Sequence, residues 1–348
     1  MTFLIFIIVL GVLVLVHELG HFLVAKKAGV QVDEFGFGYP PRALKIGKKW
    51  GTLFSLNWIP FGGFVKILGE NYEEDEVRDT SYETREKNFT QVSKKWQAAI
   101  LVAGVTCNII FAWFLFSLGF MIGLPTSVEN DFGGVVKNPV LTITKVLASS
   151  PAQMAGLKSG DKIKKKENNS VGNVLIEIDR GGQNFNFEIT PISGLATDKK
   201  IIGIEMNMVG ILSLPLHKAI YQGGKTTFEI TYLTVGGLFN LVKDAVRGQA
   251  DISQVTGPVG IIGLVGDASR LGFAYLISFT ALISINLAII NLIPFPALDG
   301  GRLLFVIIEG VTKRKINPKF ASILNTIGFV LLISLMLIVT YRDILKLF

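Results

Sequence analysis

Two histidines and a glutamate near the N-terminus have a spacing suited to metal chemistry. His17, Glu18 and His21 fit the pattern H-E-x-x-H. On a helix, residues four apart lie on one face, so two imidazoles can hold one zinc ion. Glu18 projects about 100° away along the turn, where it can act on a water molecule as a general base. The pattern predicts hydrolysis at a zinc site.

The segment that carries this pattern, residues 1–25, is apolar, and no lysine or arginine precedes Lys26. As a helix it would be roughly 36 Å long, enough to cross a hydrocarbon core about 30 Å thick. A cleaved signal peptide would have a basic start and a shorter apolar run, so we expect a membrane span. The alternative for the histidines is a polar cluster that ties helices together. Ionisable residues inside a span are costly, however, and favour a functional site.

A catalytic zinc ion needs a third protein ligand, and the candidate is Asp299. This residue follows Pro294 and Pro296 and precedes two glycines in a late apolar segment. Taken alone, Asp299 could be the N-cap of a helix that begins after the proline break. Beside a two-histidine site in another span, a zinc ligand is the better interpretation.

Composition places these residues in a polytopic membrane protein. Half of the 348 residues are apolar and the mean hydropathy is +0.50. The sequence predicts four transmembrane spans, at residues 1–25, 97–124, 271–311 and 321–343. As a straight helix the third would be roughly 60 Å long, so we expect its prolines and glycines to break it. The formal charge is +7, but basic residues flank the spans, so no nucleic-acid partner is expected.

Charge also predicts the orientation. Residues 26–96 contain twelve lysines or arginines, and the short loop after the broken span is basic as well. The positive-inside rule makes both loops cytoplasmic, with both termini and residues 125–270 external.

The segments between the spans have patterns of their own. Residues 51–68 alternate around Pro60, Gly62 and Gly63, which predicts a β-hairpin with a glycine turn. Residues 125–211 read as a small α/β domain, and residues 212–270 as an amphipathic interfacial segment.

The pattern H-E-x-x-H, the later N-x-x-P-x-P-x-L-D-G from Asn291 to Gly300 and the insert between them resemble the site-2 protease family. The resemblance covers nearly the whole chain and is closest to the bacterial branch with a single PDZ insert, the sigma-E regulator protease type. It implies that His17, His21 and Asp299 bind Zn²⁺. It also implies that Glu18 is the catalytic acid and base, and that Asn291 helps to hold the substrate backbone.

Further segments match this family. The hairpin at 51–68 corresponds to a membrane-associated β-hairpin believed to pair with substrate, which would replace hydrogen bonds lost when a substrate helix unwinds. A scaffold role for the hairpin is the alternative. Residues 257–260 resemble the segment before the late span, and residues 150–161 resemble a PDZ pattern. Residues 164–169 depart from that pattern, so this domain would bind peptide or only exclude bulky substrates.

The sequence therefore predicts a multi-pass protein of the bacterial inner (cytoplasmic) membrane with one external PDZ-like domain. The expected activity is intramembrane zinc proteolysis of single-span proteins, such as anti-sigma factors or remnant signal peptides, within the lipid bilayer. The alternatives are a membrane transporter, which broken helices and buried charge would suit, and an inactive PDZ-bearing scaffold. The intact set of His, Glu and Asp and the lack of an internal repeat favour the protease.

Overall fold

The structure is a computed structural model that describes residues 1–70, 87–129, 132–147, 150–168, 172–194, 197–248 and 257–345. Its contacts divide the chain into two units. The first comprises Met1–Leu115, Gly224–Asp267 and Phe279–Phe348, and the second comprises Phe116–Gly223 and Ala268–Ser278. Each unit is described below by itself.

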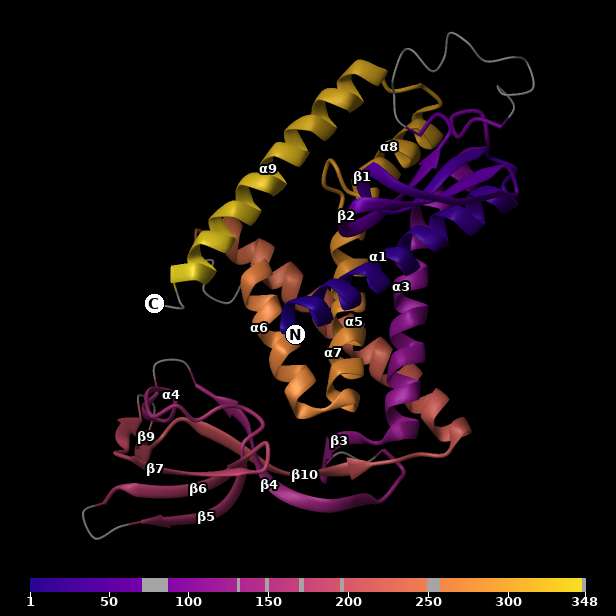
Figure 1. The fold of residues 1–348 in the computed structure, drawn as a ribbon. Helices are drawn as coiled ribbons and strands as arrows, with labels where there is room; N and C mark the ends of the chain where they lie inside the picture. Colours follow the sequence, from indigo (N-terminus) through magenta and orange to yellow (C-terminus); the bar gives the residue numbers. More distant parts are fainter. Residues whose placement is uncertain are drawn as a thin grey trace. The chain divides into compact units, whose positions relative to one another are not determined.

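Four helices are long and apolar enough to cross a membrane (Figure 1), as the sequence predicts. They are α1 (Thr2–Lys27), α3 (Lys94–Ile122), α7 (Phe273–Leu292) and α9 (Pro318–Leu345). Each exceeds the roughly 20 residues that a bilayer core requires, or equals it in the case of α7. The chain is therefore built as a membrane protein.

The late apolar segment is broken, as expected from its prolines. Helix α7 ends at Leu292, residues 293–298 are not helical, and α8 (Asp299–Thr312) begins after them. The start of α8 folds back against this break. A Cβ atom at Gly300 would lie 2.2 Å from the Ile293 carbonyl oxygen, and one at Gly301 would lie 2.3 Å from the Phe295 carbonyl oxygen. Only glycine permits so close an approach, which explains the paired glycines after Asp299.

The β-hairpin is larger than the sequence predicts, and the predicted turn is wrong. Strand β1 (Val32–Lys49) pairs antiparallel with β2 (Thr52–Ile67). The chain turns at Trp50 and Gly51, whose φ angles are 53° and 76°. Positive φ at both central residues is the two-residue turn that matches the twist of a hairpin. Gly62 and Gly63, the predicted turn, lie inside β2.

The hairpin packs on α1. Phe22 of α1 makes edge contacts with Phe35 of β1 and Phe54 of β2, at ring-centre distances of 5.5 and 5.8 Å. Such aromatic pairs add about 0.5–1.5 kcal/mol each beyond their buried area. Gly11 also lies under the ring of Phe37, because a Cβ atom there would be 3.0 Å from that ring. These contacts hold β1 and β2 beside the helix that carries His17 and His21.

Two further helices follow the strand-rich region. Helix α5 (Leu216–Val246) is amphipathic and exposes an aromatic stripe of Tyr221, Phe228, Tyr232 and Phe239. Helix α6 (Pro258–Leu271) begins where the Asp343 carboxylate of α9 accepts a hydrogen bond of 2.8 Å from the Gly260 N–H. Asp343 thus satisfies a backbone donor at the N-terminus of α6.

The second unit contains a six-stranded sheet in the order β3-β10-β4-β5-β6-β7. These strands are β3 (Leu124–Ser127), β4 (Val136–Val146), β5 (Lys162–Asn168), β6 (Val174–Arg180), β7 (Gln183–Ile189) and β10 (Ile204–Leu212). A separate pair is formed by β8 (Ile192–Gly194) and β9 (Thr197–Ile201), and α4 (Pro151–Met154) is a single helical turn capped by Ser150. The unit is mainly β-sheet, with isoleucines such as Ile143, Ile176 and Ile178 in its core.

Candidate metal centre

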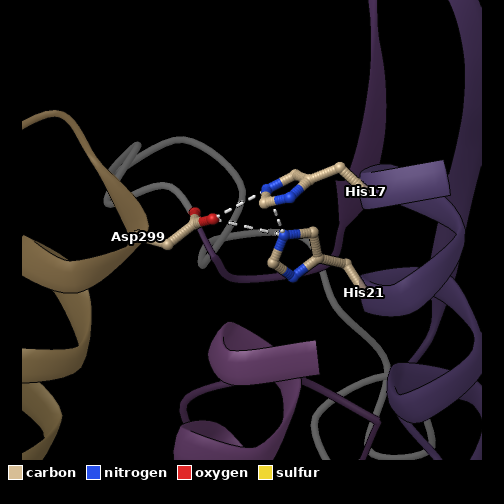
Figure 2. Close-up of side chains that lie close together, drawn as sticks. All are labelled: His17, His21 and Asp299. Atoms are coloured by element: carbon tan, nitrogen blue, oxygen red, sulfur yellow. Dashed lines mark hydrogen bonds and ion pairs between the residues drawn. The ribbon is translucent and has the colours of Figure 1, made fainter. Parts of the chain in front are cut away.

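Three side chains predicted to bind metal lie together in the first unit. His17 and His21 project from one face of α1, and Asp299 is the first residue of α8. Asp299 Oδ2 lies 2.9 Å from His17 Nε2 and 3.3 Å from His21 Nε2, and the two Nε2 atoms are 3.1 Å apart. Figure 2 shows the carboxylate directed at both imidazoles. Residues separated by 282 positions therefore converge on one point.

The donor set fits a zinc ion. Two ligand atoms each about 2.1 Å from a tetrahedral zinc would be roughly 3.4 Å apart, close to the separations above. Both histidines are buried, and two nitrogens plus one carboxylate oxygen leave a fourth position for chemistry.

Asp299 is not the N-cap of its helix. The N-cap of α8 is Leu298, which makes no side-chain capping bond. The Asp299 carboxylate instead contacts the two histidines. The structure therefore contradicts the N-cap interpretation of Asp299 and leaves its carboxylate beside both imidazoles.

The ring of His21 is held by a backbone carbonyl. His21 Nδ1 donates a hydrogen bond of 2.8 Å to the Ile100 oxygen of α3. This bond fixes the proton on Nδ1 and leaves the lone pair of Nε2 directed at the site.

The ring of His17 has an amide neighbour, Asn108 of α3. Asn108 Nδ2 lies 3.3 Å from His17 Nδ1, while Asn108 Oδ1 is buried without a hydrogen-bond partner among the described residues. The two orientations of an amide have the same shape, so a half-turn brings Oδ1 to this position. Oδ1 then accepts a hydrogen bond from His17 Nδ1–H. That arrangement pairs the buried oxygen and frees Nε2 for a metal.

Helix α3 forms the floor of the site through a glycine. A Cβ atom at Gly104 would lie 2.3 Å from His21 Nε2 and 2.8 Å from His17 Nε2. Gly20 of α1 approaches α3 equally closely, because its Cβ atom would lie 2.4 Å from the Ala103 oxygen. Neither Gly104 nor Asn108 belongs to a motif in the sequence. Their only signal is a spacing of four, which puts both on one face of an apolar helix.

Glu18 lines a cavity of about 300 Å³ together with the three candidate ligands His17, His21 and Asp299. Strand β2 borders this cavity: Gly63, Phe64 and Val65 line it, and a Cβ atom at Gly63 would be 3.7 Å from Glu18 Cγ. The ion pair between Glu70 and Arg302 also lines the cavity. Glu18 therefore lines the same cavity as His17, His21 and Asp299.

Asn291, predicted to hold substrate, lies at the end of α7. Its Nδ2 atom is 3.4 Å from His17 Nε2. This amide is therefore close to the point on which the predicted ligands converge, where it can donate a hydrogen bond to a bound group.

Comparison with known proteins identifies relatives along the whole chain. Residues 5–335 match the model of Peptidase family M50. A protein of Clostridium perfringens named "Putative zinc metalloprotease" is 35% identical over 352 residues, which cover 96% of this chain and 95% of the relative. A protein of Clostridium acetobutylicum with the same description is 34% identical, covering 97% of this chain and 96% of the relative. One of Staphylococcus aureus is 28% identical over 440 residues, covering 100% of this chain and 99% of the relative.

Proposed function

The chain belongs to peptidase family M50, the site-2 protease family of zinc metalloproteases, and we propose that it hydrolyses peptide bonds within the membrane-spanning segments of single-span proteins. The supporting observation is the position of H-E-x-x-H within α1, a helix that can itself cross a membrane. A soluble protease with a membrane anchor would carry this motif outside the anchor. Membership of this family favours a protease over the transporter and scaffold alternatives.

In this proposal His17, His21 and Asp299 hold the zinc ion. When bound, zinc polarises the scissile carbonyl and acidifies the attacking water. Glu18 takes a proton from that water and later delivers it to the leaving amine. Asn291 donates a hydrogen bond to the carbonyl oxygen of the bond that is cut, which its distance from His17 supports.

We further propose that the hairpin holds the substrate in an extended form. One edge of residues 63–66 in β2 pairs with residues 34–37 of β1. In the described part of the chain, no strand pairs with the other edge of residues 63–66. The same segment borders the cavity that contains Glu18. A substrate that unwinds and adds to this edge would exchange its lost helical hydrogen bonds for strand bonds. Exposed Leu44, Ile46 and Trp58 suit a hairpin that lies against lipid.

The proposed substrates are anti-sigma factors or remnant signal peptides in a bacterial inner membrane. Residues 26–96 would be cytoplasmic, and both termini and the β-sheet domain at 125–211 would be external. This PDZ-like domain would bind the external part of a substrate or exclude substrates with a large external part.

Cleavage of a single-span protein in detergent tests the proposal. Wild type, Glu18→Gln and the control Glu205→Gln, at an exposed position of β10, are compared after their zinc content is measured. We expect zinc in all three and cleavage by wild type and the control only. Mass spectrometry should place the cut inside the apolar segment of the substrate. A cut confined to the soluble part, or full cleavage by Glu18→Gln, would contradict the proposal.

A further inference from the structure

A second cavity, of about 440 Å³, lies in the first unit at the end of α1. Three of its lining side chains are lysines: Lys26 of α1, Lys48 of β1 and Lys87. Among the described residues, none that lines this cavity is acidic, and none of them also lines the cavity that contains Glu18. It is therefore a separate, basic site.

Its electrostatics favour an anion. Lys26 Nζ donates a hydrogen bond of 2.9 Å to the Trp50 carbonyl oxygen, and Asp33 interacts with its charge from outside the cavity. Among the residues that the structure describes, Lys48 and Lys87 form no ion pair. Three ammonium groups around one cavity repel each other, and a bound anion would relieve that repulsion.

The position of the cavity indicates which anion. Lys26 ends the apolar run of α1, so the cavity lies where a spanning helix leaves the hydrocarbon core. The Trp50 side chain at its rim is 67% exposed, and its ring centre is 6.5 Å from that of Phe22 and 4.7 Å from Lys49 Nζ. Exposed tryptophan flanked by lysine is typical of the headgroup layer. Basic pockets beside membrane helices bind anionic lipid headgroups.

We propose that this cavity binds the phosphate group of an anionic phospholipid, with Lys26, Lys48 and Lys87 as its cationic partners. His21 precedes Lys26 by five residues, or roughly 8 Å along α1. A headgroup held here would fix the depth of the metal centre below the membrane surface. The binding site itself does not depend on the proposed catalytic function.

The test removes two lysines and measures retained lipid. Lys26 is left in place because it also bonds to Trp50, so the variant is Lys48→Gln with Lys87→Gln. The control, Lys45→Gln with Lys95→Gln, removes the same charge from exposed residues that do not line the cavity. Each protein is reconstituted in an equimolar mixture of phosphatidylcholine and phosphatidylglycerol and extracted in detergent. Bound phosphatidylglycerol is then counted by native mass spectrometry, with zinc content as the check on folding.

We expect wild type and the control to retain phosphatidylglycerol, and the affinity of the cavity variant to fall by about 30-fold, which corresponds to about 2 kcal/mol for two lysines. Equal retention in the cavity and control variants would overturn the proposal. If the cavity variant does not fold, two other variants take its place. Lys48→Arg with Lys87→Arg keeps both charges and must retain the lipid. Lys48→Gln alone must bind the lipid more weakly than wild type. In a further arm, inorganic phosphate is added to the lipid-loaded protein. Displacement of the lipid by phosphate at similar concentration would mean that the site takes free phosphate.

Discussion

Gly104 of α3 lies against His21 of α1 so closely that a methyl group in place of its hydrogen would be 2.3 Å from His21 Nε2. That methyl group would fill the space where both imidazoles are proposed to face a metal. The Gly104→Ala variant should therefore lose zinc and proteolysis, although alanine favours a helix by about 1 kcal/mol over glycine. Zinc per chain after dialysis, measured by mass spectrometry, checks this outcome.

The control for that variant is Gly236→Ala in α5. A Cβ atom at Gly236 would meet nothing within 4 Å, so this substitution should leave zinc and activity unchanged. Normal zinc content in Gly104→Ala would mean that the site admits a methyl group at position 104, and would contradict the steric role proposed for Gly104.

Asn108 should act on zinc affinity through His17. Asn108→Asp keeps an oxygen acceptor for His17 Nδ1–H, whereas Asn108→Leu leaves that donor unpaired. Loss of such an outer partner typically costs 10- to 100-fold in metal affinity, so we expect a fall of about that size for the leucine variant alone. Titration against a zinc chelator gives the affinities. Equal weakening of both variants would indicate a packing role for Asn108.

How far the sequence could predict this site depends on how local each signal is. The shared face of His17 and His21 can be predicted from the period of one helix, with Glu18 one residue along it. The break before Asp299 can be predicted from the chemistry of proline. The roles of Gly104 and Asn108 arise where α1 and α3 cross, and no local pattern reports such a crossing.

The hairpin shows the same limit. Its turn is set by positive φ at Trp50 and Gly51, and tryptophan is an unusual residue for that conformation. Pro60 and Gly62, which are residue types common in turns, lie within β2. A turn position predicted from these residue types alone is therefore wrong.

Membrane orientation can be tested with single cysteines on a Cys107→Ser background. Lys45 in β1 and Lys145 in β4 are exposed, and the two positions are proposed to lie on opposite sides of the membrane. A membrane-impermeant thiol reagent added to intact spheroplasts should label Lys145→Cys, and label Lys45→Cys only after lysis. The reverse pattern would refute the orientation deduced from charge.

The external domain can be removed at a point that the structure defines. Ser127 of β3 and Val209 of β10 are paired, so residues 128–208 can be replaced by an Asn-Gly turn that closes the two strands. The shortened protein should keep its zinc, because the proposed zinc ligands His17, His21 and Asp299 all lie in the first unit. If the domain excludes large substrates, the shortened protein should cut spans that carry long external segments. An unchanged dependence on external length would remove the gating role and leave the catalytic assignment intact.

Asp299 provides the sharpest test of the metal centre because it is the most distant of the proposed ligands in sequence. Asp299→Asn keeps the size of the side chain but supplies a neutral oxygen, which binds zinc poorly, and Asp299→Ala supplies none. Neither change removes a helix cap, since Leu298 holds that position and Asp299 bonds to the histidines instead. We therefore expect both variants to lose zinc affinity by more than the roughly 10- to 100-fold expected for an outer partner, and to lose proteolysis with it. Full zinc binding by Asp299→Asn would show that the ionised carboxylate of Asp299 is not a zinc ligand. The third ligand would then be sought among Glu18 and Glu70, which line the same cavity.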